Sequence, residues 1–197
     1  KSKPTKYLTP HPLNRHGTRI PRRKQNRSLE ITTSLNRLNT LDNLKAALEG
    51  VQCEGAFVPA VAPSGVGYNE FYATEEEYAE AVAEALRIEY LAIVDAGFIL
   101  QIDDPHLVTH YVKTPDLELA EYRKWVEVQI EAINYALKGV PEDRVRYHTC
   151  YGINMGPRVH DMEMKDILDI VLDIDAGAYS FEAANPRHEH EWRLWQD

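Results

Sequence analysis

The chain has 197 residues, of which 44% are hydrophobic and 27% charged, with 22 Lys and Arg residues against 31 Asp and Glu residues. This composition is typical of a folded globular domain and excludes collagen-like, low-complexity and globally disordered chains. No run of about 18 apolar residues and no apolar N-terminal leader is present, so neither a membrane span nor secretory export is expected. The two cysteines, Cys53 and Cys150, are too few for a disulfide scaffold, which favours a cytoplasmic location.

The net charge of -9 is divided unevenly along the chain. Residues 1–40 contain ten Lys or Arg residues and one acidic residue, Glu30, whereas residues 41–197 carry a net charge of -18. Four prolines interrupt residues 1–40 and no hydrophobic period runs through them, although a short helix around residues 29–38 is compatible with the pattern. We therefore expect a basic, irregular segment over residues 1–40 and a folded catalytic domain over residues 41–197.

Short apolar runs alternate with amphipathic helical patterns from residue 41 onward. A short helix is predicted over residues 41–48 and a strand over residues 56–62. A longer helix is predicted to begin at the capping box formed by Thr74 and Glu77 and to end at Gly97.

The same alternation continues in the second half of the domain. A strand is predicted over residues 98–102, followed by a helix that starts at Thr114-Pro115 and ends at Gly139. A strand over residues 145–149, a helix capped by Asp161, and a strand over residues 178–181 complete the pattern.

Apolar strands that alternate with amphipathic helices are typical of parallel βαβ units, in which helices form the crossovers and both faces of the sheet are covered. The predicted fold class is therefore α/β. Periodicity alone does not separate an open doubly wound sheet from a (β/α)8 TIM-type barrel, but the lack of a G-x-G-x-x-G motif after the first strand disfavours a dinucleotide-binding sheet. Four strands are about half of what such a barrel requires, so a barrel made by this chain alone is expected to be incomplete.

Polar side chains with catalytic potential follow each predicted strand. Ser64 follows the first strand and Asp103 the second. His148 and Cys150 lie at the end of the third strand, and Glu182 follows the fourth. Because ligands bind at the carboxyl ends of parallel strands, we expect these side chains to converge on one site.

His148 and Cys150 form the most informative spacing among these residues. Two residues apart on a strand, their side chains point to the same side and can bind one ion. An imidazole and a thiolate favour zinc, and Glu182 from the next strand is suitable as a third ligand. The alternative interpretation is a buried free cysteine beside a hydrogen-bonded histidine.

Other polar and aromatic residues are open to structural interpretations. Asp103 and Asp104 either form a turn before a proline or supply a carboxylate for a substrate ammonium group or for acid–base chemistry. The run His188-Glu189-His190 lies in a polar stretch and is expected to be solvated rather than metal-binding. Trp192 and Trp195 are expected to pack against the body of the protein or a partner.

Four segments at the strand ends occur in a familiar order: FVPAVAPSGVG, FILQIDDPHL, RYHTCYGIN and YSFEAANPRHEHEW. They resemble the cobalamin-independent methionine synthase family, and most closely its single-barrel relatives, described as 5-methyltetrahydropteroyltriglutamate–homocysteine methyltransferase-like. The resemblance covers residues 41–197 and does not extend over residues 1–40.

The resemblance implies a (β/α)8 barrel that holds zinc through His148, Cys150 and Glu182. The family's second cysteine ligand has no counterpart in this sequence. Asp103 matches the family's aspartate that contacts the amino group of homocysteine, and Ser64 is expected to join it in binding the substrate. The distance between the H-x-C and Glu motifs is longer than in methionine synthase and matches the single-barrel relatives.

The implied reaction moves a methyl group from 5-methyltetrahydrofolate to the thiol of homocysteine, giving methionine, with zinc as the cofactor that ionises the thiol. A related hypothesis is a zinc-dependent thiol alkyltransferase similar to the epoxyalkane–coenzyme M transferases, whose sulfonate-bearing acceptor requires an Arg or Lys pocket. A third is a catalytically inert, truncated fragment with an anion-binding basic tail. Nucleic acid is a weak candidate for that tail, which lacks interleaved aromatic residues, and a second copy of the chain is a candidate partner that completes the barrel.

Overall fold

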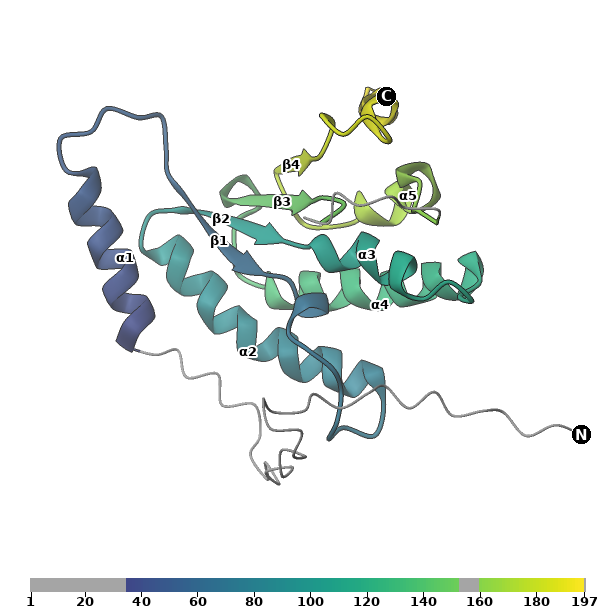
Figure 1. Ribbon diagram of the computed structural model, residues 1–197. Helices are drawn as coiled ribbons and strands as arrows, with labels where there is room; N and C mark the ends of the chain where they lie inside the picture. The colour runs from purple at the N-terminus through teal and green to yellow at the C-terminus, as the bar shows by residue number, and fades with distance from the viewer. Residues whose placement is uncertain (1–34, 153–159, 197) are drawn as a thin grey trace, which may run out of the picture.

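The computed structural model describes residues 35–152 and 160–196. Its strands are β1 (Phe57–Val61), β2 (Ile99–Asp103), β3 (Val145–Thr149) and β4 (Ala178–Phe181). Its α-helices are α1 (Leu35–Leu48), α2 (Glu75–Asp95), α3 (Pro105–Lys113), α4 (Leu119–Ala136) and α5 (Leu168–Val171), as Figure 1 shows. Short 3-10 helices include η1 (Pro63–Gly65), η3 (Met164–Asp166) and η4 (Glu189–Trp195).

The four strands form one parallel sheet in the order β1-β2-β3-β4. Each strand pairs with the next strand along the chain, so the order of the sheet does not reverse within the described residues. A doubly wound sheet changes direction at a switch point, whereas the wall of a (β/α)8 barrel runs sequentially. The predicted parallel α/β class is confirmed, and the strand order is the one a barrel wall has.

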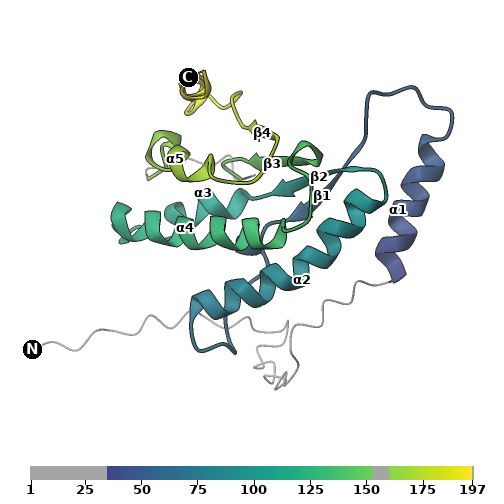
Figure 2. The ribbon, with the colours of Figure 1, turned by 180° about the vertical axis from the view of Figure 1, so that it is seen from behind.

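One face of the sheet is buried beneath α2 and α4, which pack side by side (Figures 1 and 2). Leu100, Ile102 and Tyr147 point to this face and are fully buried. The opposite face carries Phe57, which is 45% exposed, and the half-buried Gln101. Along β2, buried and half-buried residues alternate, as they do in a strand with only one covered face. For the described residues, the expectation that both faces are covered is therefore wrong.

The start of α2 confirms the predicted capping box. The Thr74 side chain accepts a 3.1 Å hydrogen bond from the Glu77 backbone N–H, and the Glu77 carboxylate accepts one from the Ala73 N–H. Val82 and Tyr90 on this helix are fully buried, as their helical spacing predicts.

Helix α3 is not among the predicted elements. The Asp104 carboxylate caps it by accepting a 3.0 Å hydrogen bond from the Leu107 N–H, and Pro105 occupies its first turn. The helix predicted to begin at Thr114-Pro115 starts at Leu119, because Thr114 is the C-cap of α3.

Two further boundaries differ from the predictions. Asp161 caps no helix: η3 begins after Glu163 without a side-chain cap, and Asp161 contacts His188 instead. Helix α1 begins at Leu35 and runs through residue 40, the predicted boundary between the basic segment and the domain. Residues 1–34 lie outside the described residues, so the assignment of an irregular segment there stays a prediction. Among the described helices, none combines the length and apolar character required to cross a lipid bilayer.

Candidate active site

The carboxyl ends of the four strands form one continuous edge. Val61, Asp103, His148 and Ser180 are partners in register across β1, β2, β3 and β4. In a parallel sheet, residues that share a register row project from the same face. Asp103 and His148 therefore lie on neighbouring strands, on the face that the helices leave uncovered, which supports the predicted convergence of these two residues.

Asp103 and His148 are each held by a neighbouring side chain. The Gln101 side-chain amide donates a 2.7 Å hydrogen bond to Asp103 Oδ1 from two residues earlier on the same strand. Nδ1 of His148 lies 3.2 Å from the Ser180 hydroxyl. These contacts orient a carboxylate and an imidazole toward the strand edge and leave His148 Nε2 without a hydrogen-bonding partner among the residues that the structure describes.

Cys150 and Glu182 directly follow the ends of β3 and β4. The backbone N–H of Tyr151 donates a 2.9 Å hydrogen bond to the Glu182 carboxylate, which ties the two strand ends together. Burial raises the pKa of the half-buried Cys150 thiol, and the carboxylates of Glu182 and Asp103 raise this pKa further. A raised pKa favours the protonated thiol at neutral pH.

The predicted zinc ligands His148, Cys150 and Glu182 come to the same edge but do not form a ready-made metal site. Within residues 35–152 and 160–196, no three His, Cys, Asp or Glu side chains are grouped closely enough to hold a metal ion. The assignment of these three ligands therefore stays a prediction.

Asp104 is a buried hydrogen-bond acceptor that connects neighbouring segments at this edge. Its carboxylate is completely buried and accepts hydrogen bonds from the Ser64 hydroxyl at 2.5 Å and the Tyr147 hydroxyl at 3.2 Å, in addition to capping α3. Burial raises the Asp104 pKa, and the hydrogen bonds oppose part of this rise. Ser64, predicted to bind substrate, uses its hydroxyl hydrogen for this bond and keeps only its oxygen lone pairs for a ligand.

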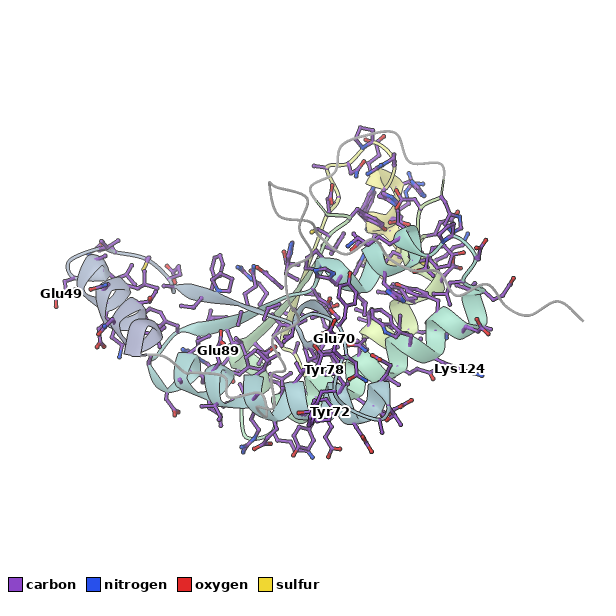
Figure 3. All side chains as sticks on the ribbon, turned by 60° about the horizontal axis from the view of Figure 1, so that its bottom comes forward. Glu49, Glu70, Tyr72, Tyr78, Glu89 and Lys124 are labelled. Atoms are coloured by element: carbon purple, nitrogen blue, oxygen red, sulfur yellow. The ribbon has the colours of Figure 1, made fainter. Side chains whose placement is uncertain are left out.

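A cleft of about 420 Å³ opens beside Ser64, between the loop after β1 and helices α2, α3 and α4. Its aromatic walls include Tyr78 and Trp125; Figure 3 shows Tyr78 next to Tyr72, and their ring centroids are 5.9 Å apart. The side-chain amide of Gln129 also borders the cleft, although this residue is only 7% exposed. The basic side chains that line the cleft all come from α3: His106, His110 and Lys113.

In the segment after β4, Glu189 and His190 are exposed, as predicted, but His188 is not. His188 is 3% exposed rather than solvated and stacks on the Tyr151 ring, with centroids 3.4 Å apart. Trp195 stacks on Phe181, which confirms that it packs against the body of the protein, whereas Trp192 is 43% exposed. The buried role of His188 has one local signal, the acidic Glu191 three residues later, which lies within reach on one helical turn.

The fold and this edge define a parallel α/β protein whose candidate active site lies at the carboxyl ends of its strands. Comparison with curated proteins shows which proteins are similar to this chain in sequence. A methionine synthase from Thermococcus kodakarensis is 30% identical over 151 residues, which are 74% of this chain and 38% of that protein. A methionine synthase from Sulfurisphaera tokodaii is 34% identical over 86 residues, and those from Saccharolobus islandicus are 36% identical over 86 residues, in each case 43% of this chain and 22% of the relative.

The chain is therefore a distant, partial homologue of archaeal methionine synthases, which confirms the resemblance found in the sequence. It spans between 22% and 38% of the length of these curated relatives. No family model matches the chain.

Proposed function

We propose that this chain carries a zinc-dependent methyl-transfer site in which the thiol of homocysteine accepts a methyl group from 5-methyltetrahydrofolate. The observation that carries the proposal is the register row that joins Asp103 to His148, with Cys150 and Glu182 directly beyond the ends of β3 and β4. Partial homology to archaeal methionine synthases supports the same chemistry. Because the chain spans only part of those relatives, the activity of the whole protein belongs to the proposal.

His148, Cys150 and Glu182 would hold the metal. They supply an imidazole nitrogen, a sulfur and a carboxylate oxygen, which are the donor types that zinc takes in proteins. The carboxylates that raise the Cys150 pKa create a negative environment that a dication would neutralise. When bound, zinc supplies the positive charge that keeps a coordinated substrate thiol ionised at neutral pH.

The remaining polar groups of the edge bind and orient. The Asp103 carboxylate is suited to accept hydrogen bonds from the ammonium group of an amino-acid thiol. The Gln101 amide, two residues earlier on β2, holds this carboxylate by a hydrogen bond, and the Ser180 hydroxyl contacts the ring of His148 and fixes its orientation. The Tyr151 N–H keeps Glu182 against the end of β3.

The cleft beside Ser64 is the place we assign to the methyl donor. A flat pterin ring with a carboxylate-bearing tail needs aromatic walls and basic groups, and the cleft offers Tyr78, Trp125 and Lys113. Titration of the protein with 5-methyltetrahydrofolate should quench tryptophan fluorescence, and Trp125→Phe should remove most of that signal. Equal quenching in both proteins would show that the methyl donor does not bind in this cleft.

Zinc analysis and calorimetry test the proposal directly. The purified chain should bind close to one equivalent of zinc, and Cys150→Ser should reduce this amount strongly while the matched change Cys53→Ser, at an exposed cysteine, leaves it unchanged. Homocysteine should bind the zinc-loaded chain, and Asp103→Asn should weaken its binding about tenfold or more, because a hydrogen bond between two charged groups is lost. Zinc below about a tenth of an equivalent would argue against the intact metal site.

A second acceptor is favoured by one observation. Arg146 lies two residues before His148 on the same face of β3, and its Nε is buried without a hydrogen-bonding partner among the described residues. A guanidinium suits the sulfonate of coenzyme M. Tighter calorimetric binding of coenzyme M than of homocysteine, lost in Arg146→Gln, would select this acceptor.

A further inference from the structure

A largely buried cluster of polar side chains, Tyr151, Asp161, His188 and Glu191, joins three separate segments of the chain. His188 lies between two carboxylates: its Nε2 is 3.1 Å from Asp161 Oδ2 and its Nδ1 is 3.1 Å from Glu191 Oε2. His188 and Glu191 are 3% and 5% exposed. The ring of Tyr151 covers one face of the imidazole, in nearly parallel planes.

Glu191 ties further groups into this cluster. Its carboxylate accepts hydrogen bonds from the Tyr151 hydroxyl and from the Met164 backbone N–H. The two ring nitrogens of His188 lie on opposite edges of the imidazole, so one side chain bridges the carboxyl groups of Asp161 and Glu191. His188 therefore links the partly buried Asp161 to the buried Glu191, and the Arg187 guanidinium, 3.6 Å from Asp161, adds a positive charge beside it.

Tyr151 connects this cluster to the candidate active site. Its ring and hydroxyl contact His188 and Glu191, while its backbone N–H donates to the Glu182 carboxylate. The residue before it is Cys150. Tyr151 thus contacts the C-terminal segment at two points: at His188 and Glu191 in the cluster, and at the candidate metal ligand Glu182.

We propose that His188 is a positioning residue: by holding Asp161 and Glu191 together against Tyr151, it fixes the segment after β4 so that the Glu182 carboxylate stays on the Tyr151 N–H, opposite Cys150. The role of Glu182 as a metal ligand rests on the proposed function, whereas the contact between Glu182 and Tyr151 is independent of any metal. Loss of the His188 imidazole would remove the bridge between Asp161 and Glu191 and the ring stacked on Tyr151, and would release this segment.

Hydrogen exchange at the Tyr151 amide tests the proposal without zinc. In His188→Gln, exchange of this amide should accelerate about tenfold or more, as expected when a hydrogen bond to a charged group is lost. Glu191→Gln preserves the shape of its side chain and should act in the same direction to a smaller extent. Asn134→Ala is the matched control, because it removes hydrogen bonds that tie α4 to the segment before β4 without touching the cluster.

Zinc affinity, measured by chelator competition well below the unfolding temperature of every variant, supplies the second readout. His188→Gln should weaken zinc binding about tenfold and Asn134→Ala should not, although both lower stability. If the unmutated chain binds no zinc while Tyr151 exchange still accelerates in His188→Gln, the proposed function fails and the positioning role stands. If zinc binds and neither Tyr151 exchange nor zinc affinity changes in His188→Gln or Glu191→Gln, the positioning role is overturned.

Discussion

The Ser64 hydroxyl donates a 2.5 Å hydrogen bond to the buried carboxylate of Asp104, which links the loop after β1 to the start of α3. The Asp104 backbone N–H in turn donates to the His148 carbonyl at 2.8 Å. Three strand ends are therefore joined through one residue whose side chain is completely buried. This arrangement keeps the edge that carries Asp103 and His148 in place.

Replacing Asp104 by Ala should destabilise the protein by about 2–4 kcal/mol, because the change removes a helix cap and leaves the buried hydroxyl of Tyr147 without an acceptor. Urea unfolding followed by circular dichroism measures this loss. Asp116→Ala, at an exposed position in the turn before α4, is the control and should stay within about 0.5 kcal/mol of the unmutated protein. A loss of similar size in both variants would show that Asp104 is not the connecting residue.

The raised pKa of Asp104 predicts how stability depends on pH. Since the folded-state pKa lies above the ordinary value of 3.8, the native state binds a proton more readily than the unfolded state between these two values. This carboxyl therefore adds stability as the pH falls through its folded-state pKa toward 3.8. The unfolding free energy of the unmutated protein relative to Asp104→Asn should rise from pH 7 to pH 4, and a constant difference would contradict the raised pKa.

The strand ends could be predicted from the sequence because each is marked locally. A short apolar run followed by polar residues locates Asp103, His148 and Glu182 at one edge once the strands are parallel. The parallel order itself follows from the amphipathic helices between the runs. Each apolar run and the polar residues that follow it lie within a few positions of one another, so the sequence alone reveals them.

The missed features depend on contacts between distant segments. The Asp-Pro pair before α3 is a capping signal, but it is equally typical of a turn, and only the bonds from Ser64 and Tyr147 show that Asp104 is buried. The polar stretch around His188 predicts a solvated side chain, and its partners Tyr151 and Asp161 lie too far away in the sequence for a local pattern to reveal them. Burial of a polar residue is decided by such partners rather than by its neighbours.

Gly177 should not tolerate a side chain. A Cβ at this position would lie 2.7 Å from the Glu142 carbonyl oxygen and 3.1 Å from the Asp143 Cα, and both are backbone atoms. Gly177→Ala should therefore destabilise the protein by about 1–3 kcal/mol in urea unfolding, because the chain before β4 must move. Gly55→Ala is the control: its nearest contact would be 3.7 Å, and a comparable loss there would rule out this steric explanation.

The alkylation rate of the Cys150 thiol should depend on the negative charge of the carboxylates around it. Because Glu182 raises the Cys150 pKa in the metal-free protein, Glu182→Gln should lower this pKa and speed alkylation at pH 8 in the presence of a chelator. A Cys53→Ser background leaves Cys150 as the single thiol. Glu189→Gln, at an exposed position on the same segment, should leave the rate unchanged, and equal rates in all three proteins would contradict the electrostatic coupling.

The His110 ring stacks on Trp125 with centroids 4.1 Å apart, and its pKa is lowered from 6.5 by burial and by the positive charges of Lys113 and His106. A lowered folded-state pKa means that the unfolded state binds the proton first, so stability from this residue is present above pH 6.5 and is lost as the pH falls through the folded-state value. His110→Phe keeps a ring against Trp125 but does not titrate. The unfolding free energy of the unmutated protein relative to His110→Phe should therefore fall between pH 7.5 and pH 5, and the fluorescence of Trp125 should be quenched below pH 6.5 only in the protein that contains His110. An identical pH dependence in the two proteins would show that His110 titrates as it does in solvent.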